Sequence, residues 1–458
     1  MPEKLSSRDL HAELEKARAW SLAPVETAPD LARNLGGVYT TLRTLDLGCY
    51  DPHQLAEDAP VLIDSLFKTR MALRDRVDEW RSKGLVGHEV QAAIRNLLRI
   101  TRYGGDMLGE MAMDFRRLPS TGHTQMAFTG RSNNTLINPR FDVGSDLAFK
   151  SGDVILVRGR AHNSAAIARI GDVDSQYSHV GIVYVDPAGK HWMTEVLIEK
   201  GGVIVPLKDA LQHGLGRAIL FRHRDPVLAH NAGYIAHEHV RHSLSHYGKP
   251  IRYDFTMKME SYKQMFCSKL IRFAYEKASE GEVKLSTFET RLDMKNVDFF
   301  DRIGVLANST FAPGDMELEP DFDVVAEWQD YRVTSDLRLQ DMVMDKLLEW
   351  MDTRSYKFKE TLAIHLIALL GRFSTYLSPG IKSMVADSIP EVPSHMPRRT
   401  IATNVMLHKT AEPIVEELRA LETERNGRFH FPLHPSEVLE WLERHSSKSA
   451  GEIGYLSA

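Results

Sequence analysis

The stretch SHVGIVY, residues 178–184, begins with a serine and a histidine and continues as a β-branched, apolar run that is typical of a buried strand. Further along the chain, FCSKLIRFAY, residues 266–275, sets a cysteine near the start of an apolar pattern with helical spacing. A thiolate is the reactive form of cysteine, and the free N–H groups and positive dipole end of a helix N-terminus favour it. A strand histidine that faces such a thiol is the minimum equipment of a thiol hydrolase. We therefore predict that His179 and Cys267 meet in the folded chain.

A carboxylate follows on the next predicted strand. Counting back from the turn DPAG, residues 186–189, an antiparallel pairing places Glu195 beside His179. Glu195 has the same strand parity as the apolar residues Met193 and Leu197, so the three side chains point to one face. A carboxylate on an apolar face needs a partner, and we expect it to orient the histidine ring as the third member of a triad does.

Each of these residues also has a purely structural interpretation. A lone cysteine more often packs in a core than acts as a nucleophile, and a histidine at a strand start is often satisfied by a backbone carbonyl. Two features favour the catalytic interpretation: the helix start that SYKQ, residues 261–264, indicates just before Cys267, and the histidine available on a strand. The other cysteine, Cys49, lies in the turn LGCYDP with only His53 nearby, and we interpret it as a structural thiol.

The hydrophobic pattern divides the chain into parts, and 458 residues are too many for one core. Five short apolar runs separated by tight turns indicate a small, strongly curved antiparallel sheet. These runs are residues 153–157, 179–185, 192–198, 202–207 and 218–222. Helical patterns surround them at residues 58–83, 88–103, 208–213, 231–246, 265–277, in two helices within 339–377, and at 413–423 after a proline-rich link at 379–397. We expect an α+β protein with a helical N-terminal region (1–118), a connector (119–148), a catalytic domain (149–330) and a helical C-terminal region (331–458).

Taken together, the runs GDVILVRG, SHVGIVYV, TEVLIEKGGVIVPL, YDF and FCSKLIRFAY resemble the permuted NlpC/P60 papain-like cysteine hydrolases, the YiiX/YebB-like group, whose superfamily also holds the lecithin:retinol acyltransferase-like enzymes. In that family the histidine strand precedes the cysteine helix, as it does here. The resemblance covers roughly residues 149–300 and implies a circularly permuted papain-like core with Cys267 as nucleophile, His179 as base and Glu195 as third member. The family often has Tyr-Cys-Ser-Glu where this chain has a lysine at the last position, Lys269, which changes the charge beside the site.

These parts predict a thioester mechanism, in which Cys267 attacks a carbonyl carbon and His179 protonates the leaving group. The backbone N–H of Cys267 and a second donor would hold the oxyanion. Tyr253 and Gln264 are candidates for that donor, although a packed tyrosine and a solvated glutamine are the commoner roles of such residues.

Three functions are compatible with this reading. The leading one is hydrolysis of an amide, such as a peptide or peptidoglycan-type bond. The second is hydrolysis or transfer of a lipid acyl ester at the same site, for which a helix at residues 362–377 and the methionines within 107–113 would suit a lipid groove, although core filling is the commoner role of methionine. The third is an inactive binding module, against which the intact set of cysteine, histidine and glutamate argues.

Composition excludes several other classes of protein. The net charge of −5 gives no drive toward nucleic acid or an anionic membrane surface, and the short basic pair at residues 398–399 lacks interleaved aromatic residues. Two cysteines cannot form a disulfide framework. Residues 1–9 lack the apolar core of a signal peptide, and no run is long enough to span a membrane. We therefore expect a cytoplasmic protein, unless a specialised secretion route exports it.

A cofactor is not expected either. The residues His237, His239, His242 and His246 suggest a metal site, but only Glu238 accompanies them, and a solvated, partly packed histidine face is the more ordinary interpretation. The glycine pairs at residues 104–105 and 201–202 lack the spacing of a phosphate-binding loop, and we interpret them as turns.

Overall fold

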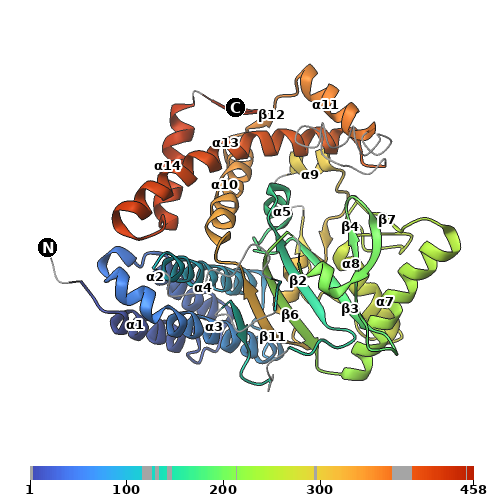
Figure 1. Ribbon diagram of the computed structural model, residues 1–458, viewed down its shortest axis with the longest axis horizontal. Coiled ribbons are helices and arrows are strands. Elements are labelled where there is room, and N and C mark those ends of the chain that lie inside the picture. Colours follow the sequence, from blue (N-terminus) through green and yellow to red (C-terminus); the bar gives the residue numbers. More distant parts are fainter. Residues whose placement is uncertain are drawn as a thin grey trace.

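The computed structural model describes residues 4–115, 126–128, 134–141, 147–212, 214–292, 297–373, 395–449 and 451–458. Its centre is a seven-stranded sheet with the strand order β1-β11-β6-β2-β3-β4-β5, and every neighbouring pair is antiparallel (Figure 1). The strands are β1 (Thr135–Ile137), β2 (Val154–Gly159), β3 (His179–Val185), β4 (His191–Leu197), β5 (Gly201–Pro206), β6 (Leu215–His223) and β11 (Phe322–Gln329). Five of them are the predicted strands, so the α+β class and the antiparallel sheet are confirmed.

The remaining two strands lie outside the runs that predicted the sheet. Strand β1 comes from the predicted connector, most of which lies outside the described residues, and it pairs with β11 at the far end of the catalytic segment. Strand β11 in turn pairs with β6 along nearly its whole length. Two segments far apart in the sequence therefore complete one edge of the sheet.

The two faces of the sheet are covered differently. Alternate residues such as Val180 and Ile182 pack with α7 (Pro226–Tyr247) and α8 (Cys267–Ala278), and residues of the long helix α3 (Pro52–Ser82) lie in the same cluster. On the other face, residues such as Val183 pack with α6 (Leu207–Ala210) and with short segments around residues 126–128 and 147–149. The strand period of two thus separates two apolar cores.

Helix α7 approaches the sheet closely because it carries a glycine at the contact. A Cβ at Gly233 would lie 2.6 Å from the amide nitrogen of Gly152 and 2.7 Å from the carbonyl oxygen of Val183. Both are backbone atoms, which cannot give way as a flexible side chain can. Nearby, the hydroxyl of Tyr275 on α8 donates to the carbonyl of Gly152 at 2.8 Å, so both helices are fixed to the same strand start.

The N-terminal block consists of four helices and a short 3-10 turn. They are α1 (Ser7–Ser21), α2 (Ala28–Arg43), η1 (Leu47–Cys49), α3 (Pro52–Ser82) and α4 (His88–Asp114). The interpretation of residues 104–105 as a turn is wrong, since both glycines lie inside α4, where Gly104 allows close packing on Leu66 of α3. Met107 and Met111 follow on the same helix and are buried, which is the core-filling role. Residues 201–202 likewise open strand β5 and are not a free turn, although Gly201 has a φ of +72°.

The C-terminal block contains α9 (Val297–Ile303), α10 (Thr334–Thr353), α11 (Leu362–Phe373), α13 (Arg398–Phe429) and α14 (Pro435–Lys448). The two helices predicted within 339–377 correspond to α10 and α11, and the last residues of that prediction and most of the proline-rich link lie outside the described residues. The predicted helix at 413–423 is too short. Pro413 lies inside α13, because buried residues on both sides of it, such as Ala411 and Ile414, continue the apolar face and outweigh the local cost of the proline.

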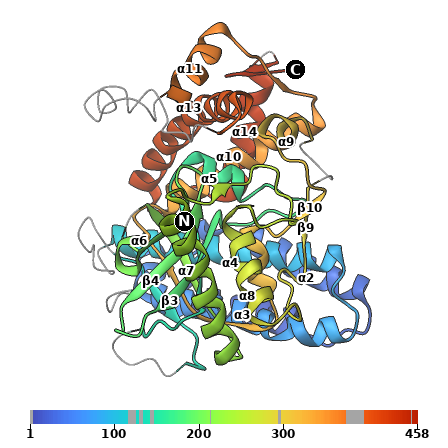
Figure 2. The ribbon, with the colours of Figure 1, turned by 90° about the vertical axis from the view of Figure 1, so that its right-hand side faces the viewer.

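Short elements complete the chain. They are α5 (His162–Ile167), β7 (Arg252–Tyr253), β8 (Gln264–Met265), β9 (Thr290–Arg291), β10 (Ser309–Thr310), η2 (Pro313–Leu318), β12 (Lys357–Phe358), β13 (Glu452–Ile453) and β14 (Leu456–Ser457). In both views the C-terminal helices lie above the sheet and the N-terminal helices lie below them, with α5 and α10 between (Figures 1 and 2). Among the described helices, none is both long and apolar enough to cross a membrane.

Ion pairs shielded from solvent join the helical blocks to the sheet and to each other. They are Arg70–Glu327 (2.7 Å, α3 to β11), Arg217–Asp106 (2.6 Å, β6 to α4), Arg158–Asp341 (2.8 Å, β2 to α10) and Arg338–Glu110 (2.8 Å, α10 to α4). Removing one partner of such a pair leaves an uncompensated buried charge, which typically costs about 3–5 kcal/mol. The helical blocks are therefore integral to the packing of the sheet.

Candidate active site

Strand β3 and helix α8 bring the predicted nucleophile and base together. Helix α8 begins at Cys267, and the preceding residue, Phe266, is extended and forms its N-cap, so the predicted helix start is confirmed. The amide of the first helical residue has no acceptor within its own helix. His179 is the first residue of β3, and Cys267 lies close enough for its side chain and its charge to raise the pKa of the imidazole.

Glu195 on β4 forms the second contact of the histidine. Its Oε2 lies 2.6 Å from Nε2 of His179, as the count from the hairpin turn predicted. Gly181 lies one residue beyond the last paired position of β3 and β4, beside Glu195. A Cβ at Gly181 would be 3.3 Å from Cβ of Glu195 and 2.4 Å from Cε of Met193. The glycine of the SHVGIVY stretch therefore leaves room for Glu195 to reach diagonally to the ring.

The electrostatics of His179 follow from these two contacts. Burial lowers the pKa of the imidazole, but the hydrogen bonds to Cys267 and Glu195 and the charges of both groups outweigh it and raise the pKa from 6.5 to about 10. The ring is about 20% exposed and the carboxylate about 11%, so solvent screens the pair only weakly. The imidazole of His179 is therefore protonated at neutral pH.

The first turn of α8 is anchored on both sides of the cysteine. The hydroxyl of Ser268 donates to the carbonyl of Phe311, and the ammonium of Lys269, which is fully buried, lies 2.9 Å from Oδ2 of Asp254. The other oxygen of Asp254 accepts from the hydroxyl of Thr256 at 2.6 Å. The lysine that departs from the family's usual glutamate therefore brings no unbalanced charge to the site, and sequence reasoning missed its partner.

The two candidate oxyanion donors lie in different environments. Tyr253 is buried on β7, and burial together with the charge of Cys267 raises the pKa of its phenol well above the usual value, so it remains a proton donor. Gln264 is exposed on β8, which pairs with β7 in parallel. Among the described residues, no interaction joins the Gln264 side chain to Cys267 or His179.

The C-terminal block reaches the edge of the site. His395, just before α13, approaches the backbone carbonyl of Tyr253 with its Nε2 at 3.3 Å, and its ring lies 5.6 Å from that of Phe255. Phe255 and Met257 pack against both the sheet core and the C-terminal core. Cys267 itself is only 5% exposed. The site therefore lies beneath the junction of the sheet with the C-terminal helices, which no local sequence pattern indicated.

The other cysteine and the α7 histidines lie apart from these contacts. Cys49 is exposed, and its Sγ lies 3.5 Å from a carboxylate oxygen of Asp46. On α7, the rings of His242 and His246 stack at 4.9 Å, and that of His239 packs on Phe273. Within the described part of the chain, these histidines belong to no group of three metal-ligating side chains.

A cysteine at a helix N-terminus, packed on an antiparallel sheet that carries a histidine and a carboxylate, is the arrangement of papain-like cysteine hydrolases, here with the histidine strand first. Residues 148–318 match the family described as permuted papain-like amidase enzyme, YaeF/YiiX, C92 family. The family match over this segment agrees with the resemblance to the permuted papain-like cysteine hydrolases. Searches of curated proteins and of solved structures found no match.

Proposed function

We propose that the protein hydrolyses an amide bond of a peptide-like substrate, including peptidoglycan-type peptides, through a thioester on Cys267. The observation that carries the proposal is the convergence of three groups: Cys267 at the start of α8, His179 in contact with it, and Glu195 at 2.6 Å from the imidazole. A match to an amidase family over the same segment supports the amide as the bond attacked.

The first half of the reaction uses the proton stored on the imidazole. The sulfur of Cys267 attacks the carbonyl carbon, and the carbonyl oxygen becomes an oxyanion. The N–H of Cys267 at the helix start and the hydroxyl of Tyr253, whose pKa the charge of Cys267 raises, are the donors that we expect to stabilise it. His179 then gives its proton to the leaving nitrogen, the C–N bond breaks, and the amine departs from the thioester.

The second half reverses the proton transfer. His179, now neutral, takes a proton from water, and the hydroxide attacks the thioester carbonyl. The C–S bond breaks, the carboxylic acid leaves, and the thiolate and imidazolium are restored. Glu195 does not exchange protons in this cycle. Its carboxylate holds the ring in one orientation and stabilises the charged form.

A lipid acyl ester is the alternative substrate for the same thioester chemistry. The methionines that would have lined a lipid groove are packed within α4, which weakens that argument. The exposed leucines Leu362 and Leu366 on α11 are the feature that still favours a lipid surface. An inactive binding module is disfavoured by the intact contacts of His179.

Alkylation separates a reactive site from an inactive one. Iodoacetamide at mildly acidic pH should label Cys267 faster than Cys49, although Cys267 is buried and Cys49 is exposed. The reason is that the charge of Asp46 raises the pKa of the Cys49 thiol, whereas the thiolate of Cys267 is paired with the imidazolium. Faster labelling of Cys49 would contradict the proposal.

Substrate assays separate the two chemistries. The full chain is incubated with peptidoglycan fragments and peptide amides in one series and with phospholipid vesicles in the other, and free amine and free fatty acid are measured. Amine release that is lost in Cys267→Ala and kept in the matched control Cys49→Ala supports the amidase. Fatty acid release that depends on Cys267, without amine release, would replace it by the lipid hydrolase.

A further inference from the structure

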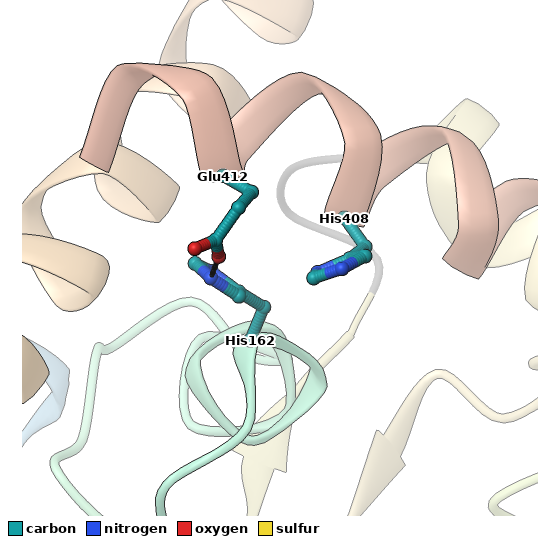
Figure 3. Close-up of side chains that lie close together, drawn as sticks. All are labelled: His162, His408 and Glu412. Atoms are coloured by element: carbon teal, nitrogen blue, oxygen red, sulfur yellow. Dashed lines mark hydrogen bonds and ion pairs between the residues drawn. The ribbon is translucent and has the colours of Figure 1, made fainter. Parts of the chain in front are cut away.

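A cluster of three metal-ligating side chains lies outside the cysteine site. His162 is the first residue of α5, while His408 and Glu412 lie one turn apart on α13. Figure 3 shows the three side chains converging on the space between the two helices, with His162 bonded to Glu412. One ligand atom from each residue lies within 4.8 Å of the other two.

The three residue types form a set that transition metals select. Two imidazoles and one carboxylate supply three ligands, and zinc sites with three protein ligands complete their coordination with water. Positions i and i+4 of a helix share one face, so His408 and Glu412 present their side chains to the same point.

The surroundings hold the cluster in place. The second oxygen of Glu412 accepts from Nη1 of Arg419 at 3.0 Å, and the charge of Arg419 is balanced by Asp336. Such outer contacts orient a metal-binding carboxylate. His162 is only 7% exposed, and its Nδ1 is a buried nitrogen for which the described residues supply no hydrogen bond. Its other ring nitrogen, Nε2, contacts Glu412 and is therefore the one available to an ion shared with that carboxylate.

A simple hydrogen-bonded tether between the two helices is the competing interpretation. The contact of His162 with Glu412 would be sufficient for it, and His408 would then be a bystander. Yet the rings of His408 and His162 lie 5.1 Å apart at 57°, which brings a third donor to the pair at the open side of the cluster. A hydrogen-bonded tether needs only His162 and Glu412, whereas a metal ion would take His408 as its third ligand.

We propose that His162, His408 and Glu412 bind a divalent transition metal of the zinc class, which clips helix α13 of the C-terminal block to helix α5 of the hydrolase domain. The strand that leads to α5 also pairs with the strand of the catalytic histidine: in β2, Val157 lies opposite His179 of β3, and α5 follows β2. The metal would thereby fix the C-terminal block over the hydrolase domain. This proposal does not depend on the reaction at Cys267.

The test measures metal binding by the full chain in the background Cys49→Ser/Cys267→Ala, which removes both thiols as competing ligands. Metal-free protein is titrated with Zn²⁺ by calorimetry and with Co²⁺ by visible absorption, whose d–d bands report the ligand geometry. One equivalent should bind. Loss of an outer-shell partner typically lowers metal affinity roughly 10- to 100-fold. The variants His408→Ala and Glu412→Gln each lose a direct ligand, so their affinity for the metal should fall by a larger factor.

The matched control is His242→Ala/His246→Ala, which removes the exposed histidine pair of α7. It should leave the affinity unchanged. His408 is exposed and has no hydrogen bond to lose among the described residues, so its variant should fold, which circular dichroism checks. No binding by the parent protein, unchanged affinity in the two α13 variants, or loss of binding in the α7 control would each overturn the proposal.

Discussion

Replacing Glu195 with glutamine should lower the pKa of His179 without emptying the space beside it. In the native site, the contacts with Cys267 and Glu195 outweigh burial and raise that pKa from 6.5 to about 10. A hydrogen bond to a charged group is worth about 1.5–3 kcal/mol, and one pKa unit corresponds to about 1.4 kcal/mol. Loss of the carboxylate should therefore lower the pKa of His179 by about 1–2 units, to between about 8 and 9.

Alkylation of Cys267 reads this shift without any substrate. In a Cys49→Ser background, the rate of reaction with iodoacetamide should show a step where the imidazolium loses its proton, because the thiolate then loses its ion partner. The step should lie near pH 10 in the parent and move to lower pH in Glu195→Gln. Coincident profiles would refute the argument that Glu195 supports the charged ring.

A matched control and a second readout sharpen the result. Glu199 is an exposed acid just after β4 whose charge acts on Tyr253, so Glu199→Gln should leave the step in place. The same proton also affects stability. Because the folded pKa of His179 is higher than its ordinary 6.5, the contribution is complete below that pH and is lost as the pH rises to about 10. In Glu195→Gln that loss should finish at lower pH in urea unfolding experiments.

Three further outcomes concern the scaffold. Lys269→Met should lower the unfolding free energy by about 3–5 kcal/mol, because Asp254 is left as an unpaired buried charge. The double variant Lys269→Met/Asp254→Asn should recover much of that loss. An unchanged unfolding free energy in the single variant would contradict the buried pair. Glu327→Gln should cost about 3–5 kcal/mol at pH 7 in urea unfolding, while Glu452→Gln at an exposed pair should cost under about 1 kcal/mol. Burial raises the pKa of Glu327, but two buried arginines outweigh it and lower the pKa to about 2. The contribution of this carboxylate to the unfolding free energy is therefore present above pH 4.5 and is lost as the pH falls toward 2. The glutamine variant should not show that loss. Gly233→Ala should destabilise the fold by about 1–3 kcal/mol, because the new methyl group meets backbone atoms of the sheet, and an unchanged melting temperature would argue against that close contact.

The sequence predicted best those contacts and helix starts that a local pattern, such as a tight turn, determines. The hairpin turn at residues 186–189 sets the register of two adjacent strands, and that register is enough to bring Glu195 to His179. The start of α8 was also predictable, because polar residues precede an apolar helical face. The meeting of Cys267 with His179 was predicted from the chemistry of a thiol and an imidazole and was supported by the family resemblance, since chain order alone does not fix how a helix docks on a sheet.

What escaped prediction depends on long-range packing. Strand β11 was not among the predicted strands, because its strand character comes from burial between β1 and β6. The pairing of Lys269 with Asp254 has no local signature that distinguishes it from a solvated pair. The spacing of His408 and Glu412 was visible in the sequence, but their partner His162 lies far upstream and only the fold brings it near.

The position of β11 matters for the design of a fragment limited to the segment that matches the amidase family. A fragment trimmed to residues 148–318 would lack this strand and would leave β6 as an open rim with unpaired amides and carbonyls. Arg217 of β6 would lose its counter-ion Asp106 at the same time. Such a fragment would tend to stack with its own copies, so biochemistry on this protein calls for the uncut chain.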